Sequence, residues 1–355
     1  MDCRVLDAVR DRMAWHGILA RLPVVYRDLY FTPEWVALHA RGPTASPCLY
    51  VYEEGGEILV HPFVLRRLSQ IGHSILTFPA ADIESAYGYA GPGSTCVSPR
   101  FLESAWGAYD EWCKSQYVVA EFVRLHPLLK NERLLPERVI RTYDRETVSI
   151  DLIDVGAGGQ PYSSKARNMI RRCVKAGGVA VTLSGRPAFD EFRTLYSHTM
   201  IRIGAPGYYH WDEAYFENLY SLLERTGVVI GVKRDGRLLA AGLFLKGARW
   251  MHYHLSASLS EGGIPGAVNL MLHKAALLGA QEGLSHLHLG GGTSGDAEDS
   301  LLYFKKSMST LRHQFHIGRR VHDEDTYEEL ECLWRREHRD LHGSKMERLI
   351  FYRDD

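Results

Sequence analysis

The 355-residue sequence lacks paired cysteines, long apolar runs and an excess of charge of one sign. Its six cysteines are scattered without a C-x-x-C pair, which argues against a disulfide framework and against a zinc site. Nowhere do about 18 apolar residues follow one another, and residues 1–20 carry charges throughout, so neither a membrane span nor a signal peptide is expected. These absences favour a cytoplasmic protein without stable membrane insertion.

The charge balance limits the possible partners. Lys and Arg together number 42 and Asp and Glu 43, which gives a formal net charge of −1. Without a global basic field, DNA is not expected as a partner, and any RNA contact must come from a local patch. The length suits two domains, and a hydrophobic content of 45% is enough for a real core.

The second half of the chain has the pattern of one α/β domain. Helices are predicted over residues 164–176, 187–201 and 212–225, and a hairpin over 228–233 and 237–245. Asp235-Gly236 is its turn, because this pair suits positive φ at both central positions. A strand at 250–256, a long helix at 267–282, a strand at 284–289, a helix at 300–308 and a strand at 312–317 follow. This order resembles that of an acetyltransferase (GNAT-type) domain.

The first half is a weaker copy of the same order. Thr32-Pro33 opens a short helix, residues 48–53 and 57–64 form a hairpin, and Ser98-Pro99 caps an amphipathic helix. Strands follow at 118–123 and 147–152. We therefore expect two tandem GNAT-like α/β domains, 1–150 and 151–320, with a cleft between them. A helix at 327–342, within residues 321–355, is expected to pack back on the first domain.

The most informative segment is the helix at 300–308, which begins after an acidic, glycine-rich loop. It presents Phe304 beside Lys305 and Lys306. An ammonium on such an element can stabilise the oxyanion that develops when an amine attacks an ester carbonyl. From the residues alone, an ordinary amphipathic helix with solvated lysines is the alternative.

At this point the chain resembles the Fem family, which forms peptide bonds with aminoacyl-tRNA as the donor. The Phe304-Lys305 pair is similar to the family's hallmark near the C-terminus. The resemblance also rests on the order of several segments: residues 87–92 (YGYAGP), 121–127 (EFVRLHP), 164–168 (SKARN), 199–209 and 252–258 (HYHLSAS). It implies that Lys305 is the main catalytic residue, with Phe304 beside it. No cofactor is implied, because aminoacyl-tRNA is itself the donor substrate.

The resemblance further implies a set of substrate-binding residues. They lie in the segments just named and comprise Arg202, Tyr209, Thr199, Tyr253, His254, Arg167, Lys165, Tyr89 and Arg124. Arg202 is expected in a glycine- and proline-containing loop between helices, where it would anchor a phosphate or carboxylate. The implied partners are the acceptor end of aminoacyl-tRNA and the amine of a peptide, either a peptidoglycan precursor or a small peptide such as a peptidyl antibiotic.

Two departures from the family pattern affect the acceptor. No heptad segment is present that would form the long coiled-coil arm of some members. His254 stands where many relatives have an aromatic residue. The acceptor therefore need not be the usual cell-wall precursor.

Two further patterns in the sequence can each be interpreted in two ways. Residues 164–176 contain five basic side chains over about 160° of a helix surface, which suits either phosphate binding or a solvated face. His286-x-His288 places two imidazoles on one face of a strand, but a third metal ligand is not evident.

Other functions remain possible. A coenzyme A-dependent N-acyltransferase would need a glycine loop that binds a diphosphate, and residues 260–267 contain such glycines. Glu261 opposes an anion there, and Pro265 removes an amide donor. A non-catalytic binding module is the other alternative, although it would not need an intact Phe304-Lys305.

Overall fold

The computed structural model describes residues 2–260, 262–296, 298–337 and 348–353. Contacts divide the chain into two units: unit 1 comprises Met1–Asp144 and Phe315–Asp355, and unit 2 comprises Arg145–Gln314. The chain enters unit 2 within strand β7 (Ile140–Asp151) and returns to unit 1 within strand β13 (Leu311–Val321).

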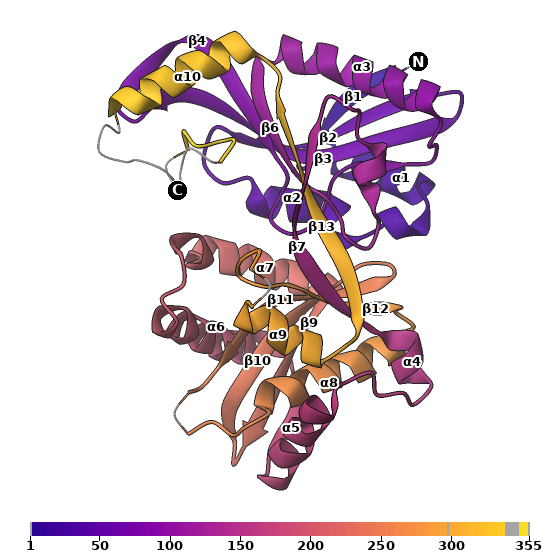
Figure 1. Ribbon diagram of the computed structural model, residues 1–355, viewed down its shortest axis with the longest axis vertical. Coiled ribbons are helices and arrows are strands. Elements are labelled where there is room, and N and C mark those ends of the chain that lie inside the picture. The colour runs from indigo at the N-terminus through magenta and orange to yellow at the C-terminus, as the bar shows by residue number, and fades with distance from the viewer. Residues whose placement is uncertain (1, 261, 297, 338–347, 354–355) are drawn as a thin grey trace. The chain divides into compact units, whose positions relative to one another are not determined.

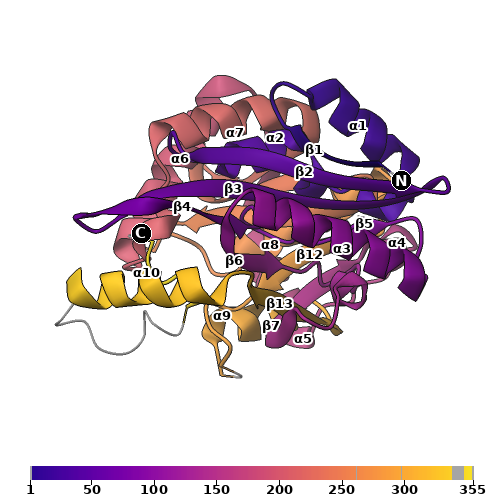
Figure 2. The same cartoon turned by 90° about the horizontal axis from the view of Figure 1, so that it is seen from above.

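Unit 1 is built on a sheet with the strand order β1-β2-β3-β4-β6-β13, and the short β5 lies beside β3. Its pairs are antiparallel except β4 and β6, which run parallel. Figure 2 shows β2, β3 and β4 side by side. The strand bounds are β1 Asp2–Asp7, β2 Ala45–Glu54, β3 Glu57–Ile71, β4 Ser74–Glu84, β5 Gly93–Ser94 and β6 Val118–Arg124.

The helices of unit 1 pack on this sheet through separate apolar clusters. Trp106 and Tyr109 of α3 lie in the main core with residues of β2, β3 and β6. Leu330 and Trp334 of α10 form a second cluster with residues of β3, β4 and β6, and both helices are labelled in Figure 1. The helix bounds are α1 Arg12–Arg21, η1 Val24–Tyr26, η2 Leu29–Phe31, α2 Pro33–His39, α3 Pro99–Ser115, η3 Asn131–Leu134 and α10 Glu324–Glu337. The rest of the helix expected at 327–342 lies outside the described residues.

Strand β6 carries a buried carboxylate that links several elements of unit 1. Glu121 Oε1 accepts hydrogen bonds from His61 Nε2 and Tyr109 Oη, both at 2.9 Å, and Oε2 lies 2.9 Å from His322 Nε2. Burial raises the pKa of Glu121, but the bonds from His322 and His61 outweigh it and hold the pKa well below its usual range. Because His322 directly follows β13, this network fixes the returning chain to the sheet.

Unit 2 repeats the arrangement with the strand order β7-β12-β11-β10-β9-β8. Its pairs are antiparallel except β11 and β12, which run parallel. The strand bounds are β8 Val179–Leu183, β9 Gly227–Arg234, β10 Arg237–Lys246, β11 Trp250–Ser258 and β12 His286–Gly291. The helix bounds are α4 Leu152–Gly156, α5 Ser164–Lys175, α6 Gly185–Arg202, η4 Gly207–Tyr209, α7 Glu213–Thr226, α8 Ala267–Gln281 and α9 Ser300–Ser307.

The core of unit 2 joins the sheet to α4, α5, α8 and α9. Met271 of α8, Phe244 of β10 and Leu287 of β12 lie in it, and all three are fully buried. Helices α6 and α7 contact β9, β10 and β11 through residues outside this cluster. Gly266, which precedes α8 with φ +87°, must be glycine, since a Cβ there would lie 2.1 Å from the carbonyl oxygen of Met169.

The two units share one topology. In each, a helix connects the parallel strands (α3 or α8), and two α-helices lie between the strands at one edge of the sheet, β1 and β2 in unit 1 and β8 and β9 in unit 2. One strand of each sheet is exchanged: β7 follows β6 in the chain but pairs with β12, whereas β13 follows β12 but pairs with β6. The repeat predicted from the sequence is therefore confirmed, with an exchange that it did not predict.

Several local predictions are also confirmed. Thr32 caps α2 by accepting from the backbone of Trp35, and Asp235 and Gly236 have φ of +50° and +79° in the turn between β9 and β10. Ser98 precedes α3 as expected but makes no side-chain cap hydrogen bond. No coiled-coil arm occurs in the described part of unit 2, where α6 is the longest helix.

Candidate active site

The loop between β12 and α9 is organised around the carboxylate of Asp299. Oδ1 accepts from the backbone N–H of Leu302 at 2.8 Å and so caps α9, while Oδ2 accepts from the N–H groups of Thr293 at 2.9 Å and Ser294 at 3.2 Å. A Cβ at Gly292 would lie 2.5 Å from this carboxylate, so the loop requires glycine there. Burial raises the pKa of Asp299, but the hydrogen bonds outweigh it and keep the group ionised far into the acid range.

Lys305 lies on α9 with its ammonium turned to the end of β12. Its side chain is buried, and Nζ donates a hydrogen bond of 2.6 Å to the carbonyl oxygen of Gly291. Burial lowers the pKa of Lys305 to about 7, Asp299 partly offsets this, and the guanidinium of Arg145 adds to it. With this pKa, the group is divided near neutral pH between its charged and neutral forms.

The two adjacent lysines of α9 have different surroundings. Lys306 is part-exposed and forms an ion pair of 2.7 Å with Glu146. Its neighbour Lys305 is buried, as expected for side chains that leave a helix about 100° apart. Phe304 is part-buried against the core of unit 2. Only Lys305 therefore combines burial with a backbone acceptor at the end of β12.

The parallel strands β11 and β12 separate beside this position. They pair at Trp250–His286, Met251–Leu287 and His252–His288, although β11 continues to Ser258 and β12 to Gly291. Beyond His252 and His288 the described residues of the two strands make no further pairs. Helix α9 contacts β12 past this point. Strands that separate at their carboxyl ends leave unpaired backbone donors and acceptors, which suits the binding of an acyl group.

A serine–histidine pair that sequence reasoning missed lies on the neighbouring strands. Ser149 Oγ of β7 is 2.7 Å from Nε2 of His313, and Ser149 pairs in register with His288. No motif marks these residues, because the pair joins β7 to β13, two strands that lie far apart in the sequence. His286 and His288 both belong to β12, and among the described residues neither takes part in a group of three possible metal ligands.

The predicted residues of α6 contact the end of β11. Thr199 is buried, and its hydroxyl donates to Leu195 and accepts from the N–H of Ser258 at 3.3 Å. Arg202 is exposed and donates to the carbonyl oxygen of Ser258 at 3.0 Å. Arg202 was expected in a loop between helices, but it is the last residue of α6. Tyr209 ends η4, and its carbonyl accepts from Tyr196.

Tyr253 and His254 follow one another on β11 and have different partners. The Tyr253 ring stacks on Phe244 with centroids 5.3 Å apart, and burial raises its pKa to about 12. His254 Nε2 lies 2.9 Å from the hydroxyl of Tyr215, whose ring stacks on Trp211 at 4.0 Å. Strand alternation thus assigns Tyr253 to the core cluster and His254 to the α7 side.

Lys165 and Arg167 lie at the start of α5, next to α9. The N–H of Ser163 donates to the carbonyl of Ser307 at 2.9 Å, which joins the two helices. Lys165 Nζ lies 5.3 Å from the centroid of the Tyr303 ring. Arg167 donates to the hydroxyl of Ser164 at 3.1 Å.

Tyr89 and Arg124 belong to unit 1, after strand β4 and at the end of β6. The Tyr89 ring meets those of Tyr30 and Phe315 edge to face, with centroids 5.7 and 5.1 Å apart. Arg124 forms an ion pair of 2.7 Å with Glu84 and donates to the carbonyl of Ser85 at 2.8 Å. Arg124 is therefore already held by neighbours of its own unit.

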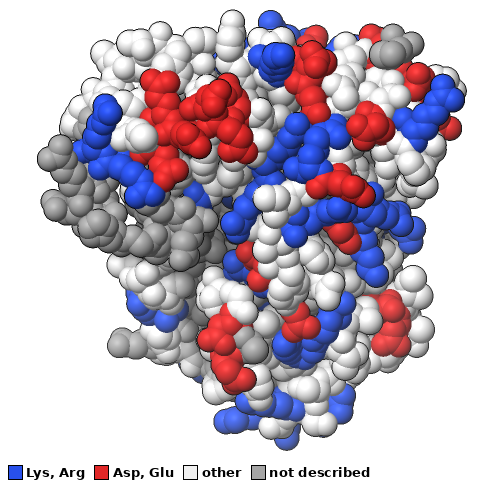
Figure 3. Space-filling model, turned by 45° about the horizontal axis from the view of Figure 1, so that its top comes forward, with Lys and Arg blue, Asp and Glu red and all other residues white. Residues whose placement is uncertain are grey.

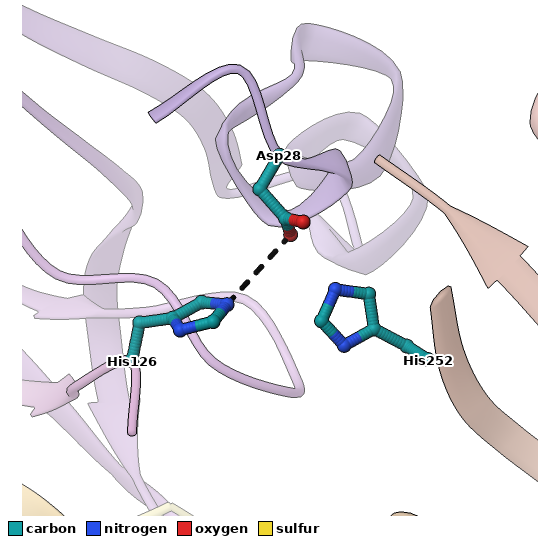
Figure 4. A group of neighbouring side chains, drawn as sticks. All are labelled: Asp28, His126 and His252. Atoms are coloured by element: carbon teal, nitrogen blue, oxygen red, sulfur yellow. Dashed lines mark ion pairs between the residues drawn. The ribbon is translucent and has the colours of Figure 1, made fainter. Parts of the chain in front are cut away.

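A buried ion pair lies near these residues in unit 1. His126 Nε2 and Asp28 Oδ1 are 3.9 Å apart, and both side chains are almost fully buried. Figure 4 shows the imidazole and the carboxylate facing one another. Asp28 also caps η2 by accepting from the N–H of Tyr30. The Arg-x-His-Pro segment predicted a functional role for this region but gave no sign of Asp28.

None of the described helices combines the length and the apolar character needed to cross a membrane.

Comparisons with known proteins agree with this architecture. Residues 161–306 match the model of the acetyltransferase (GNAT) domain. The crystal structure of FemX superposes with a TM-score of 0.68 at 15% sequence identity, covering 93% of this chain and 100% of that chain. No curated protein sequence matches the chain significantly.

Two further solved structures have the same fold at low identity. L-PGS from Bacillus licheniformis gives a TM-score of 0.55 at 12% identity, with 87% of this chain and 92% of that chain covered. The C-terminal domain of a putative lysylphosphatidylglycerol synthetase from Agrobacterium fabrum gives 0.53 at 11%, with 86% and 92% covered. The chain thus has the tandem GNAT-type acyltransferase fold, and its second unit matches an acyltransferase domain.

Proposed function

We propose that the protein is an aminoacyltransferase that moves an amino acid from aminoacyl-tRNA to the amine of a peptide acceptor. The acceptor is a peptidoglycan precursor or a small peptide natural product such as a peptidyl antibiotic. The observation that carries the proposal is the position of Lys305. Its buried ammonium is fixed at the end of β12, beside the point where the parallel strands separate.

Aminolysis of the ester sets the demands on this site. The acceptor nitrogen forms a bond to the ester carbonyl carbon, the bond from that carbon to the ribose oxygen breaks, and one proton passes from the amine to the ribose oxygen. Negative charge develops on the carbonyl oxygen in between. A preorganised ammonium in a dry site stabilises that charge far more than it would in water. Lys305 supplies such a charge, and a substrate hydroxyl is proposed to relay the proton.

The environment of Lys305 serves this role. The Asp299 carboxylate holds the loop that follows Gly291, and the Gly291 carbonyl accepts from Nζ, so the ammonium is oriented before substrate arrives. With a pKa of about 7, Lys305 keeps part of its charge at neutral pH, and the proton for the departing ribose oxygen comes from the attacking amine through the substrate hydroxyl. The low-identity structural relatives FemX and lysylphosphatidylglycerol synthetase support the aminoacyl donor by analogy only.

The adjacent lysine provides a matched control for the test. In a single-turnover transfer assay with radiolabelled aminoacyl-tRNA, Lys305→Ala is expected to lower the rate by about 10²–10³, the usual loss of an oxyanion-stabilising donor. Lys306→Ala removes the same charge one position away and should be mild. If Lys305→Ala folds normally and keeps wild-type turnover, the proposal is wrong.

The match to an acetyltransferase domain model favours a second candidate, a coenzyme A-dependent N-acyltransferase acting on a small amine. Gly262, with φ +68°, lies near Arg237, which could pair with a diphosphate. Against it, the carbonyl of Met169 lies against Gly266 at the N-terminus of α8. Glu261 lies outside the described residues. Transfer of radiolabel from acetyl-coenzyme A instead of aminoacyl-tRNA would establish this candidate.

A further inference from the structure

Helix α5 carries charge of one sign only. Its twelve residues contain no Asp or Glu, and its basic residues are Lys165, Arg167, Arg171, Arg172 and Lys175. At 100° per residue these cover about 160° of the helix, opposite the side on which Ala166 and Cys173 are buried. Within the described chain, none of the five forms an ion pair. By contrast, on the face shown in Figure 3 basic and acidic side chains are interspersed.

The start of this basic face adjoins the helix that carries Lys305. Ser163, the cap of α5, donates its N–H to Ser307 at the end of α9. Lys165 lies over the ring of Tyr303, which is 63% exposed and stands two residues before Lys305 in the same helix. An exposed aromatic ring beside a row of cations is the combination that binds single-stranded RNA, since bases stack on the ring and phosphates pair with the cations.

We propose that the basic face of α5 and the ring of Tyr303 bind the acceptor arm of a tRNA. The arginines and lysines contact stem phosphates over a helix about 18 Å long, and an unpaired base near the 3′ end stacks on Tyr303. Tyr303 and Lys305 leave α9 about 200° apart, so the unpaired nucleotides beyond the stacked base pass around the helix to bring the 3′ ester to Lys305. The assignment rests on the proposed function only in taking the bound RNA to be an aminoacyl-tRNA.

An anionic membrane is the other partner that a basic helix can have, and the structure disfavours it. Helices that lie in a lipid interface bury an exposed apolar face in it. The apolar side of α5 is instead packed in the protein, where Ala166 and Cys173 belong to the core of unit 2, and Val174 is its only exposed large apolar side chain among the described residues.

The test measures RNA binding directly with the full chain. The probe is a fluorescent, deacylated acceptor-stem hairpin, prepared with and without the unpaired 3′ nucleotides, and titrated by anisotropy at several salt concentrations. The triple variant Arg171→Ala/Arg172→Ala/Lys175→Ala should weaken binding at least tenfold at low salt. It should also reduce the slope of log affinity against log salt by about 2–3, since each phosphate contact contributes about 0.7–0.9.

Single variants separate charge from stacking. Arg172→Glu should weaken binding strongly, whereas Arg225→Glu, the same change at an exposed residue of α7, should not. Tyr303→Ala should weaken binding of the tailed hairpin by about 5- to 150-fold and leave the untailed hairpin unchanged, and Tyr303→Phe should restore it. Circular dichroism verifies that each variant is folded.

The outcomes distinguish this inference from the proposed function. Wild-type RNA affinity in the α5 and Tyr303 variants, or binding of phosphatidylglycerol vesicles in place of the hairpin, would overturn the inference. If transfer from aminoacyl-tRNA is then still observed, the proposed function stands without it. If the variants behave as expected but no donor amino acid is transferred, the surface is assigned correctly and the proposed function fails.

Discussion

Replacing Lys305 with methionine should change how the stability of the protein depends on pH. The side chain is buried, and burial lowers its pKa to about 7 from the ordinary 10.5 of a lysine. In the unfolded chain the lysine keeps its ordinary pKa and stays protonated up to about pH 10. Methionine has nearly the same length and no titratable group, so the difference between the two proteins isolates the charge.

The direction of this pH dependence follows from the number of protons that the folded and the unfolded state bind. Below pH 7 the lysine is protonated in both the folded and the unfolded state, and the folded protein bears the full cost of a buried ammonium. Between pH 7 and about 10.5 the unfolded state binds more protons, so the free energy of unfolding of the wild type rises with pH. From pH 6 to pH 9 this gain amounts to about 2.5–3 kcal/mol, because each tenfold change in proton concentration above the folded pKa is worth about 1.4 kcal/mol.

Urea unfolding of both proteins at pH 6, 7, 8 and 9 measures this difference. Lys305→Met should gain most relative to the wild type at pH 6, and the gap should close by about 2.5–3 kcal/mol toward pH 9. Curves that stay parallel over this range would refute the argument, since Lys305 would then titrate like an exposed lysine. The same titration also affects the rate of transfer. The ratio of the single-turnover rate of the wild type to that of Lys305→Arg should decline above pH 7, because the lysine loses its charge whereas a guanidinium stays charged.

Other perturbations test the surroundings of the site and the core of unit 1. Glu121→Gln removes a buried carboxylate that holds two histidines, and urea unfolding at pH 7 should show a loss of stability of about 3–5 kcal/mol. Because the pKa of Glu121 is held low, the stability advantage of the wild type over this variant should fade as the pH falls below 4.5. An unchanged urea midpoint at pH 7 would contradict the network. Asp299→Ala removes the cap of α9 and the anchor of the loop before it, so stability should fall by about 1–3 kcal/mol and transfer should slow. Unaltered turnover would show that the loop does not orient Lys305. Arg202→Ala should raise the acceptor KM by roughly 10- to 150-fold if Arg202 anchors the acceptor with a charged hydrogen bond; an unchanged KM would leave it with only its bond to Ser258.

The sequence predicted the elements that depend on local patterns. The turn at Asp235-Gly236 follows from turn chemistry, and the helix after the acidic loop follows from helical periodicity. The repeated order of helices and strands was visible for the same reason, since hydrophobic periodicity is a property of short segments.

What the sequence did not predict depends on contacts between distant segments. The exchange of β7 and β13 is a choice of pairing partner, which no local pattern encodes. The lowered pKa of Lys305 depends on burial by the whole unit, and the pair of Ser149 and His313 joins two strands that lie far apart in the sequence. Asp299 could have been found, because an acidic residue just before a helix is a common N-cap, but its bonds to Thr293 could not.

The proposed donor is an aminoacyl-tRNA. The most direct measurement incubates the full chain with a pool of tRNA charged with radiolabelled amino acids, and in parallel with radiolabelled acetyl-coenzyme A, in the presence of peptidoglycan precursors, small peptides and phosphatidylglycerol. We expect label to move from tRNA to a peptide amine in an amide-linked product. Ribonuclease treatment of the donor should abolish transfer, and Lys305→Ala should reduce it. Transfer of acetyl groups alone, or transfer from tRNA that is indifferent to Lys305, would contradict the proposal.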